Sequence, residues 1–170
     1  MIILIGGSSH TGKTFLAQKL LERYKYPYLS IDHLKMGLIK SNNTNLSVED
    51  DKKLTPYLWK IVKEIIKTNI ENNQNIIIEG LYIPFDYKCD FSDEELKNIK
   101  YICLIMSENY IRSNIINIIK YENIIEKRKY QSDINIENLI RENKHNLEMC
   151  KKYNNQYIWI DNKYDVNFSI

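Results

Sequence analysis

Five short apolar runs, separated by longer stretches with apolar residues at helical spacing, constrain the fold of this chain most strongly. The runs cover residues 2–5, 28–31, 75–78, 101–106 and 157–160. They are rich in Ile and nearly continuous rather than alternating, which is typical of strands covered by helices on both faces. Strands that alternate with helices form βαβ units with right-handed crossovers. We therefore predict a three-layer α/β fold around a mainly parallel sheet of about five strands.

The stretches between these runs carry their own helix signals. Apolar residues recur at helical spacing over 55–73, where Thr55 is a candidate N-cap and Pro56 a candidate first helical residue. Residues 92–95 read as a capping box that opens a short helix. A long helix that an interruption could divide is expected after Ser107, and another before the last strand.

The length and composition indicate one domain, 1–170, in a reducing compartment. The chain has 170 residues, a net charge of +2 and three scattered cysteines without a CxxC pair. Neither a disulfide framework nor a zinc site fits such cysteines, and no run reaches the roughly 20 apolar residues of a membrane span. We expect a cytoplasmic monomer or homodimer that binds no membrane, and the near-neutral charge argues against a nucleic-acid partner.

The segment Gly7–Thr14 matches the pattern GxxxxGK[ST], directly after the first apolar run and before a helical pattern. Its backbone N–H groups and the following helix would bind phosphates, with Lys13 on the β- and γ-phosphates and the Thr14 hydroxyl on Mg²⁺. The predicted nucleotide-binding residues are Gly7, Ser8, Ser9, His10, Thr11, Gly12, Lys13, Thr14 and Phe15. A dinucleotide fold is excluded because GxGxxG is absent, and His10 is expected to present only its backbone.

A second short match complicates the class of nucleotide protein. Residues 162–165 read NKYD, the guanine-reading NKxD pattern of GTPases. However, no DxxG follows the third run, where Ile78-Glu79-Gly80-Leu81 stands instead. We attribute the NKxD match to chance, because Asn, Lys, Tyr and Asp are abundant in this chain. The choice between ATP and GTP as donor stays open.

Two carboxylates stand at the ends of predicted strands, at the edge where parallel sheets bind ligands. Asp32 could accept or orient the proton of an attacking hydroxyl. Glu79 could hold Mg²⁺ through water. The structural alternative is that each is a solvated acid, or that Asp32 caps a helix that begins at His33.

Positive charge that closes over the γ-phosphate would come from arginines. The candidates are Arg112, one turn into the long helix, and Arg128, in a polar stretch that suits a lid at about 120–134. A solvated charge run is the alternative for Arg128.

The segments 3–14, 30–34 and 76–80 resemble P-loop kinases of the nucleoside-monophosphate-kinase type, and most nearly the small bacterial proteins described as 2-phosphoglycerate-kinase-like or zeta-toxin-like. The resemblance implies a sheet in the order 2-3-1-4-5, ATP as donor and a small helical lid after the fourth strand. It also implies the roles given above for Lys13, Thr14 and Asp32. The chain departs from the family in having few arginines, and only Lys35 and Lys40 are cationic in the helix after Asp32. This departure favours a hydroxyl acceptor over a phosphorylated one.

These observations favour an ATP- and Mg²⁺-dependent kinase that phosphorylates a small-molecule acceptor. Two alternatives stay open: a non-catalytic ATP-binding regulatory module, and a kinase acting on nucleotides or nucleic acid ends. The sequence does not identify the acceptor. Tyr82, Phe85 and Tyr87 could stack on a ring of the acceptor or belong to the core.

Overall fold

A computed structural model describes residues 1–121 and 134–169 and contains a five-stranded sheet in the order β2-β3-β1-β4-β5. All neighbouring strands are parallel. The strands are β1 (Ile2–Gly7), β2 (Tyr28–Ser30), β3 (Ile76–Glu79), β4 (Ile99–Met106) and β5 (Tyr157–Ile160). The predicted α/β class, strand number and strand order are confirmed.

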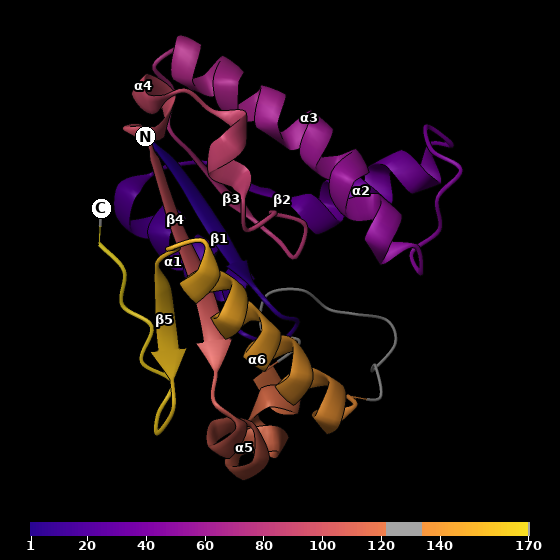
Figure 1. Cartoon of the computed structure of the whole chain (residues 1–170), viewed down its shortest axis with the longest axis vertical. Coiled ribbons are helices and arrows are strands. Elements are labelled where there is room, and N and C mark those ends of the chain that lie inside the picture. The colour runs from indigo at the N-terminus through magenta and orange to yellow at the C-terminus, as the bar shows by residue number, and fades with distance from the viewer. Residues whose placement is uncertain (122–133, 170) are drawn as a thin grey trace.

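Helices cover both faces of this sheet (Figure 1). They are α1 (Lys13–Tyr24), α2 (Ile31–Lys40), α3 (Asp51–Glu71), the 3₁₀ turn η1 (Tyr87–Asp90), α4 (Asp93–Leu96), α5 (Glu108–Tyr121) and α6 (Ile136–Lys152). The predicted capping box of Ser92 opens α4, and α5 carries the expected interruption at Asn114. The predicted lid at about 120–134 lies outside the described residues except at its ends.

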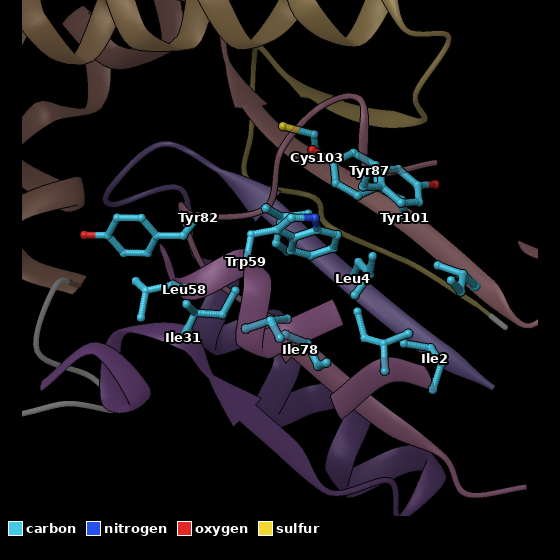
Figure 2. Packing of buried hydrophobic residues seen from close by; sticks show 14 of the residues in the cluster. Ile2, Leu4, Ile31, Leu58, Trp59, Ile78, Tyr82, Tyr87, Tyr101 and Cys103 are labelled. Carbon is cyan, nitrogen blue, oxygen red and sulfur yellow. The ribbon is translucent and has the colours of Figure 1, made fainter. Parts of the chain in front are cut away.

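The central strand β1 divides the core into two clusters because its side chains alternate between the faces. Ile2 and Leu4 pack with α3 and the C-terminal part of α6, and Figure 2 shows this cluster from close by. Ile3 and Ile5 pack on the other face with α1, α5 and the N-terminal part of α6. All four side chains are fully buried, so β1 and the segment that follows it are held firmly from both sides.

The structure corrects two predicted boundaries. Helix α3 begins at Asp51 after the cap residue Asp50, and not at Thr55, so that Pro56 lies inside the helix. The earlier start lets Leu54 bury its side chain completely against the sheet. Strand β2 ends at Ser30, which places Asp32 in the first turn of α2 rather than before it.

Strand β5 lies at the edge of the sheet, and its coverage differs from the prediction. Its residues Tyr157 and Trp159 are 37% and 47% exposed, so one face of this strand is only partly covered. Among the described residues, no helix combines the length and the apolar character needed to cross a membrane.

Replacing Leu58 by Ala is expected to destabilise the fold by about 2–5 kcal/mol, because the side chain is fully buried between α3 and the sheet. Urea unfolding followed by circular dichroism measures the change. Ile116→Ala is the matched control, since Ile116 is 78% exposed and should change stability by less than about 0.5 kcal/mol. Equal effects of the two substitutions would contradict the packing described here.

Candidate functional site

The loop between β1 and α1 turns through three residues with positive φ: Gly7 (135°), His10 (64°) and Gly12 (85°). A Cβ at Gly7 would stand 2.6 Å from the carbonyl oxygen of Leu104 on β4, so glycine is required there. Gly12 is the N-cap residue of α1 and carries no side chain to bond the N–H groups of the first turn. Such a helix N-terminus is a favourable place for an anion.

The predicted phosphate-binding lysine lies inside this loop. Lys13 is 8% exposed, and its ammonium group donates a hydrogen bond of 2.7 Å to the carbonyl oxygen of Ser8. The same carbonyl accepts a 2.9 Å bond from the hydroxyl of Thr11, which is fully buried. These bonds hold the loop closed around the lysine, and the loop therefore combines a buried positive charge with a helix N-terminus.

The two predicted metal-binding residues lie together. The Thr14 hydroxyl is 3.4 Å from Oε1 of Glu79, which ends β3 and is 2% exposed. In the sheet Glu79 stands opposite Ser30, whose buried hydroxyl has no hydrogen-bond partner in the part of the chain that the structure describes. A hydroxyl and a carboxylate fit Mg²⁺, which keeps several waters and takes few protein ligands. The described residues contain no group of three or more His, Cys, Asp or Glu that would suit a more fully protein-bound metal.

A hydrogen-bonded chain joins α2, α3 and the loop after β3. Asp32 forms a 2.8 Å ion pair with Lys35, whose ammonium donates to the Tyr82 hydroxyl at 2.9 Å. Tyr82 in turn donates to Oδ1 of Asp51 at 2.8 Å. The ring of Tyr82 is buried in the core cluster, and its hydroxyl points away from it (Figure 2). Burial raises the pKa of Tyr82 to about 12, so this phenol remains a donor at neutral pH.

Sequence reasoning missed two members of this region. Asp51 starts α3, and no motif marks it. Glu142 lies one helical turn before Asn146, which donates to the Ser8 hydroxyl at 2.9 Å and so places α6 against the loop. Partial burial raises the pKa of the Glu142 carboxyl; the neighbouring charge of Arg141 and then that of Lys13 lower it, and Asp51 adds a smaller raising effect.

The two predicted arginines are not brought to the loop by any described contact. Arg112 binds both carboxylate oxygens of Glu137, at 2.9 and 3.2 Å, and also pairs with Glu108. Its side chain is 48% exposed, and this arrangement fits a surface ion-pair cluster between α5 and α6. Arg128 lies outside the described residues.

The NKYD segment contacts the loop through Tyr164, which is the variable position of the NKxD pattern and not one of its guanine-reading residues. The hydroxyl of Tyr164 donates to the carbonyl oxygen of Thr11 at 3.2 Å, and its ring lies 6.4 Å from that of Phe15. The sequence signal was available, because Tyr164 follows β5 at the same edge of the sheet as the loop.

Comparison with known proteins identifies the fold. No protein-family model matches the chain, and no curated protein matches it either. A deoxyadenosine kinase from M. mycoides with bound dATP is similar in structure, with a TM-score of 0.58 and 18% identity, over 98% of this chain and 93% of that chain. A sugar kinase from Janibacter sp. HTCC2649 gives a TM-score of 0.53 and 13% identity, over 94% and 84%. At these identities the likeness shows the fold, and the chain has the fold of P-loop kinases.

Replacing Tyr82 by Phe should destabilise the fold by about 1–2 kcal/mol at pH 7, because the hydroxyl joins two charged groups in a mostly buried place. The folded-state pKa near 12 lies above the ordinary value of 10.0, so the unfolded phenol ionises first. The contribution of Tyr82 to stability therefore falls as pH rises from 10 to 12. Over this range the difference in free energy of unfolding between wild type and Tyr82→Phe should narrow.

Chemical denaturation at pH 7, 10 and 11.5 measures this gap. Tyr157→Phe serves as the control, since Tyr157 lies exposed on the edge strand. A gap that is absent at pH 7, or that widens with pH, would contradict the hydrogen-bonded chain.

Proposed function

We propose that this chain, with the fold of P-loop kinases, is an ATP- and Mg²⁺-dependent phosphotransferase acting on a hydroxyl of a small molecule. The proposal rests on what lies together at the junction of β1 and α1. There a buried lysine, a helix N-terminus and the Thr14–Glu79 pair lie at one edge of the parallel sheet. That edge is where open α/β sheets bind their ligands.

The loop residues bind the donor in this proposal. The N–H groups of the loop and of the first turn of α1 bond the β-phosphate oxygens, and Lys13 neutralises charge on the β- and γ-phosphates. The Lys13 ammonium lies inside the loop, 2.7 Å from the Ser8 carbonyl, and on binding it would turn from this carbonyl to the phosphates. Such preorganised positive charge is the main source of catalysis in phosphoryl transfer.

Thr14 and Glu79 would hold Mg²⁺ in this proposal, since the Thr14 hydroxyl and the Glu79 carboxylate lie 3.4 Å apart. When bound, the ion supplies charge neutralisation to the β- and γ-phosphates. Burial keeps the Glu79 carboxylate in place, since it is 2% exposed at the end of a central strand. The Ser30 hydroxyl beside it is a second oxygen that could bind an ordered water.

Asp32 orients the acceptor. The acceptor oxygen forms a bond to the γ-phosphorus, the bond from that phosphorus to the bridging oxygen of ADP breaks, and Asp32 takes the hydroxyl proton. The 2.8 Å ion pair with Lys35 fixes the carboxylate in the first turn of α2. Because this carboxylate is paired, orientation is its larger contribution and proton transfer the smaller one.

The charges on the acceptor side favour an acceptor without an anionic group. Asp32 and Asp51 are acidic, and Lys35 is already engaged by Asp32 and Tyr82. A carboxylate or phosphate brought among these acids would meet repulsion, whereas hydroxyl or amine groups would find acceptors. Arg112 contributes to transfer in this proposal only by exchanging Glu137 for phosphate on nucleotide binding.

Lys13→Ala is expected to raise the Kd of MgATP by about 30- to 100-fold, because a charge-assisted bond to phosphate is lost. Isothermal titration calorimetry measures the affinity, and a thermal melt without nucleotide checks that the variant is folded. Lys97→Ala is the matched control, since Lys97 caps the C-terminal end of the short helix α4 and its side chain is 67% exposed. Equal affinity of Lys13→Ala and wild type would exclude this loop as the nucleotide site.

Asp32→Asn is expected to leave the Kd of MgATP within about twofold and to lower kcat by about 100-fold. ADP release is followed with a panel of acceptors that differ in charge: glucosamine, glucose and gluconate, and nucleosides beside their monophosphates. We expect turnover only with acceptors that lack an anionic group.

Asp93→Asn, an exposed substitution in α4, controls for the general loss of a carboxylate. Full turnover by Asp32→Asn would remove this residue from the mechanism. Turnover only with gluconate or a monophosphate would contradict the charge argument. MgATP binding without transfer to any member of the panel would instead favour a nucleotide-binding regulatory module.

A further inference from the structure

The side chain of Tyr164 joins the segment after β5 to the phosphate loop, 152 residues away in the sequence. Its hydroxyl donates to the carbonyl oxygen of Thr11 at 3.2 Å, and the carbonyl oxygen of Gly12 lies 3.5 Å from the same hydroxyl. These two carbonyls belong to the peptides that lead directly into α1. The phenol therefore touches the backbone of the loop rather than one of its side chains.

This contact depends on the absence of a side chain at Gly12. A Cβ at that position would collide with the Tyr164 hydroxyl and its ring. Gly12 also has a φ of 85°, which L side chains rarely adopt. Gly12 thus serves two purposes, the turn into α1 and the close approach of Tyr164.

The phenol is held in its place and in its neutral form. Its ring packs at a tilt against Phe15, with centroids 6.4 Å apart, and belongs to the margin of the core cluster around α1 and α5. Burial raises the pKa of Tyr164 well above its ordinary value, and the nearby Tyr110 adds to the effect. Tyr164 therefore remains a hydrogen-bond donor at any physiological pH.

The orientation of a carbonyl fixes the N–H group on the other side of the same peptide. In a planar trans peptide the C=O and the following N–H point in opposite directions. The Thr11 carbonyl, turned towards Tyr164, thus directs the N–H of Gly12 away from the phenol. The Gly12 carbonyl also accepts the N–H of Leu16 at 2.9 Å, so the helix itself already orients the next peptide. The specific effect of Tyr164 is on the peptide between Thr11 and Gly12.

We propose that Tyr164 is a positioning residue of the nucleotide site, which holds the Thr11–Gly12 peptide with its N–H turned to the donor phosphates. The inference rests on the proposed function, because it requires that the loop bind a polyphosphate. It assigns to the segment after β5 a role in phosphate binding that does not depend on the base. A loop without this bond would have to order the peptide during binding, which lowers affinity.

The test is calorimetric titration of wild type and Tyr164→Phe with three Mg²⁺-complexed ligands: ATP, GTP and tripolyphosphate. Tyr164→Phe keeps the ring against Phe15 and removes only the hydroxyl. We expect Kd to rise by about three- to tenfold for all three ligands, as for the loss of one hydrogen bond. The melting temperature without ligand should change by less than about 3 °C, because the ring packing is retained.

Tyr157→Phe, on the exposed face of β5, is the matched control and should bind all three ligands as wild type does. Unchanged Kd values in Tyr164→Phe would overturn the inference while leaving nucleotide binding intact. A loss confined to one base would also overturn it, because the hydroxyl would then act on the base. Failure of wild type to bind any of the three ligands would instead reject the proposed function.

Discussion

The conformation of one short loop, between β1 and α1, is the constraint on which the rest of the site depends. Three positive φ angles, at Gly7, His10 and Gly12, turn the chain sharply from a buried strand into a helix. Backbone conformations of this kind cost energy, and they persist only when contacts with the surrounding structure hold them in place. Here β4 closes on Gly7, Asn146 of α6 bonds Ser8, and Tyr164 bonds the backbone before α1.

The charges around this loop are separated in a way that suits transfer between two ligands. One side combines the buried Lys13 with the N-terminus of α1, and both would favour a polyphosphate. The other side carries Asp32 and Asp51, joined through Lys35 and Tyr82. Glu79 lies between the two sides, next to Thr14. A metal ion there would reduce the repulsion between the carboxylates and the phosphates.

The sequence predicted the elements of this fold better than its contacts. Short apolar runs identified all five strands, although one face of β5 is only partly covered, and GxxxxGK[ST] located the loop. The start of α3 was missed because Thr55 and Pro56 imitate a helix start, whereas the burial of Leu54 decides it. The contact of Tyr164 with the loop was missed because the NKYD segment was weighed only as a guanine-reading pattern, although the residue follows β5 at the same edge of the sheet as the loop.

The proposed function requires that the backbone of residues 9–14 bind the polyphosphate of a nucleotide. Amide NMR of the uniformly ¹⁵N-labelled chain, titrated with MgATP and then with Mg²⁺-tripolyphosphate, tests it most directly. We expect the N–H signals of Gly12 and Lys13 to shift downfield with both ligands, while signals of α4 stay in place. Saturating shifts elsewhere in the chain, with the loop signals unchanged, would contradict it.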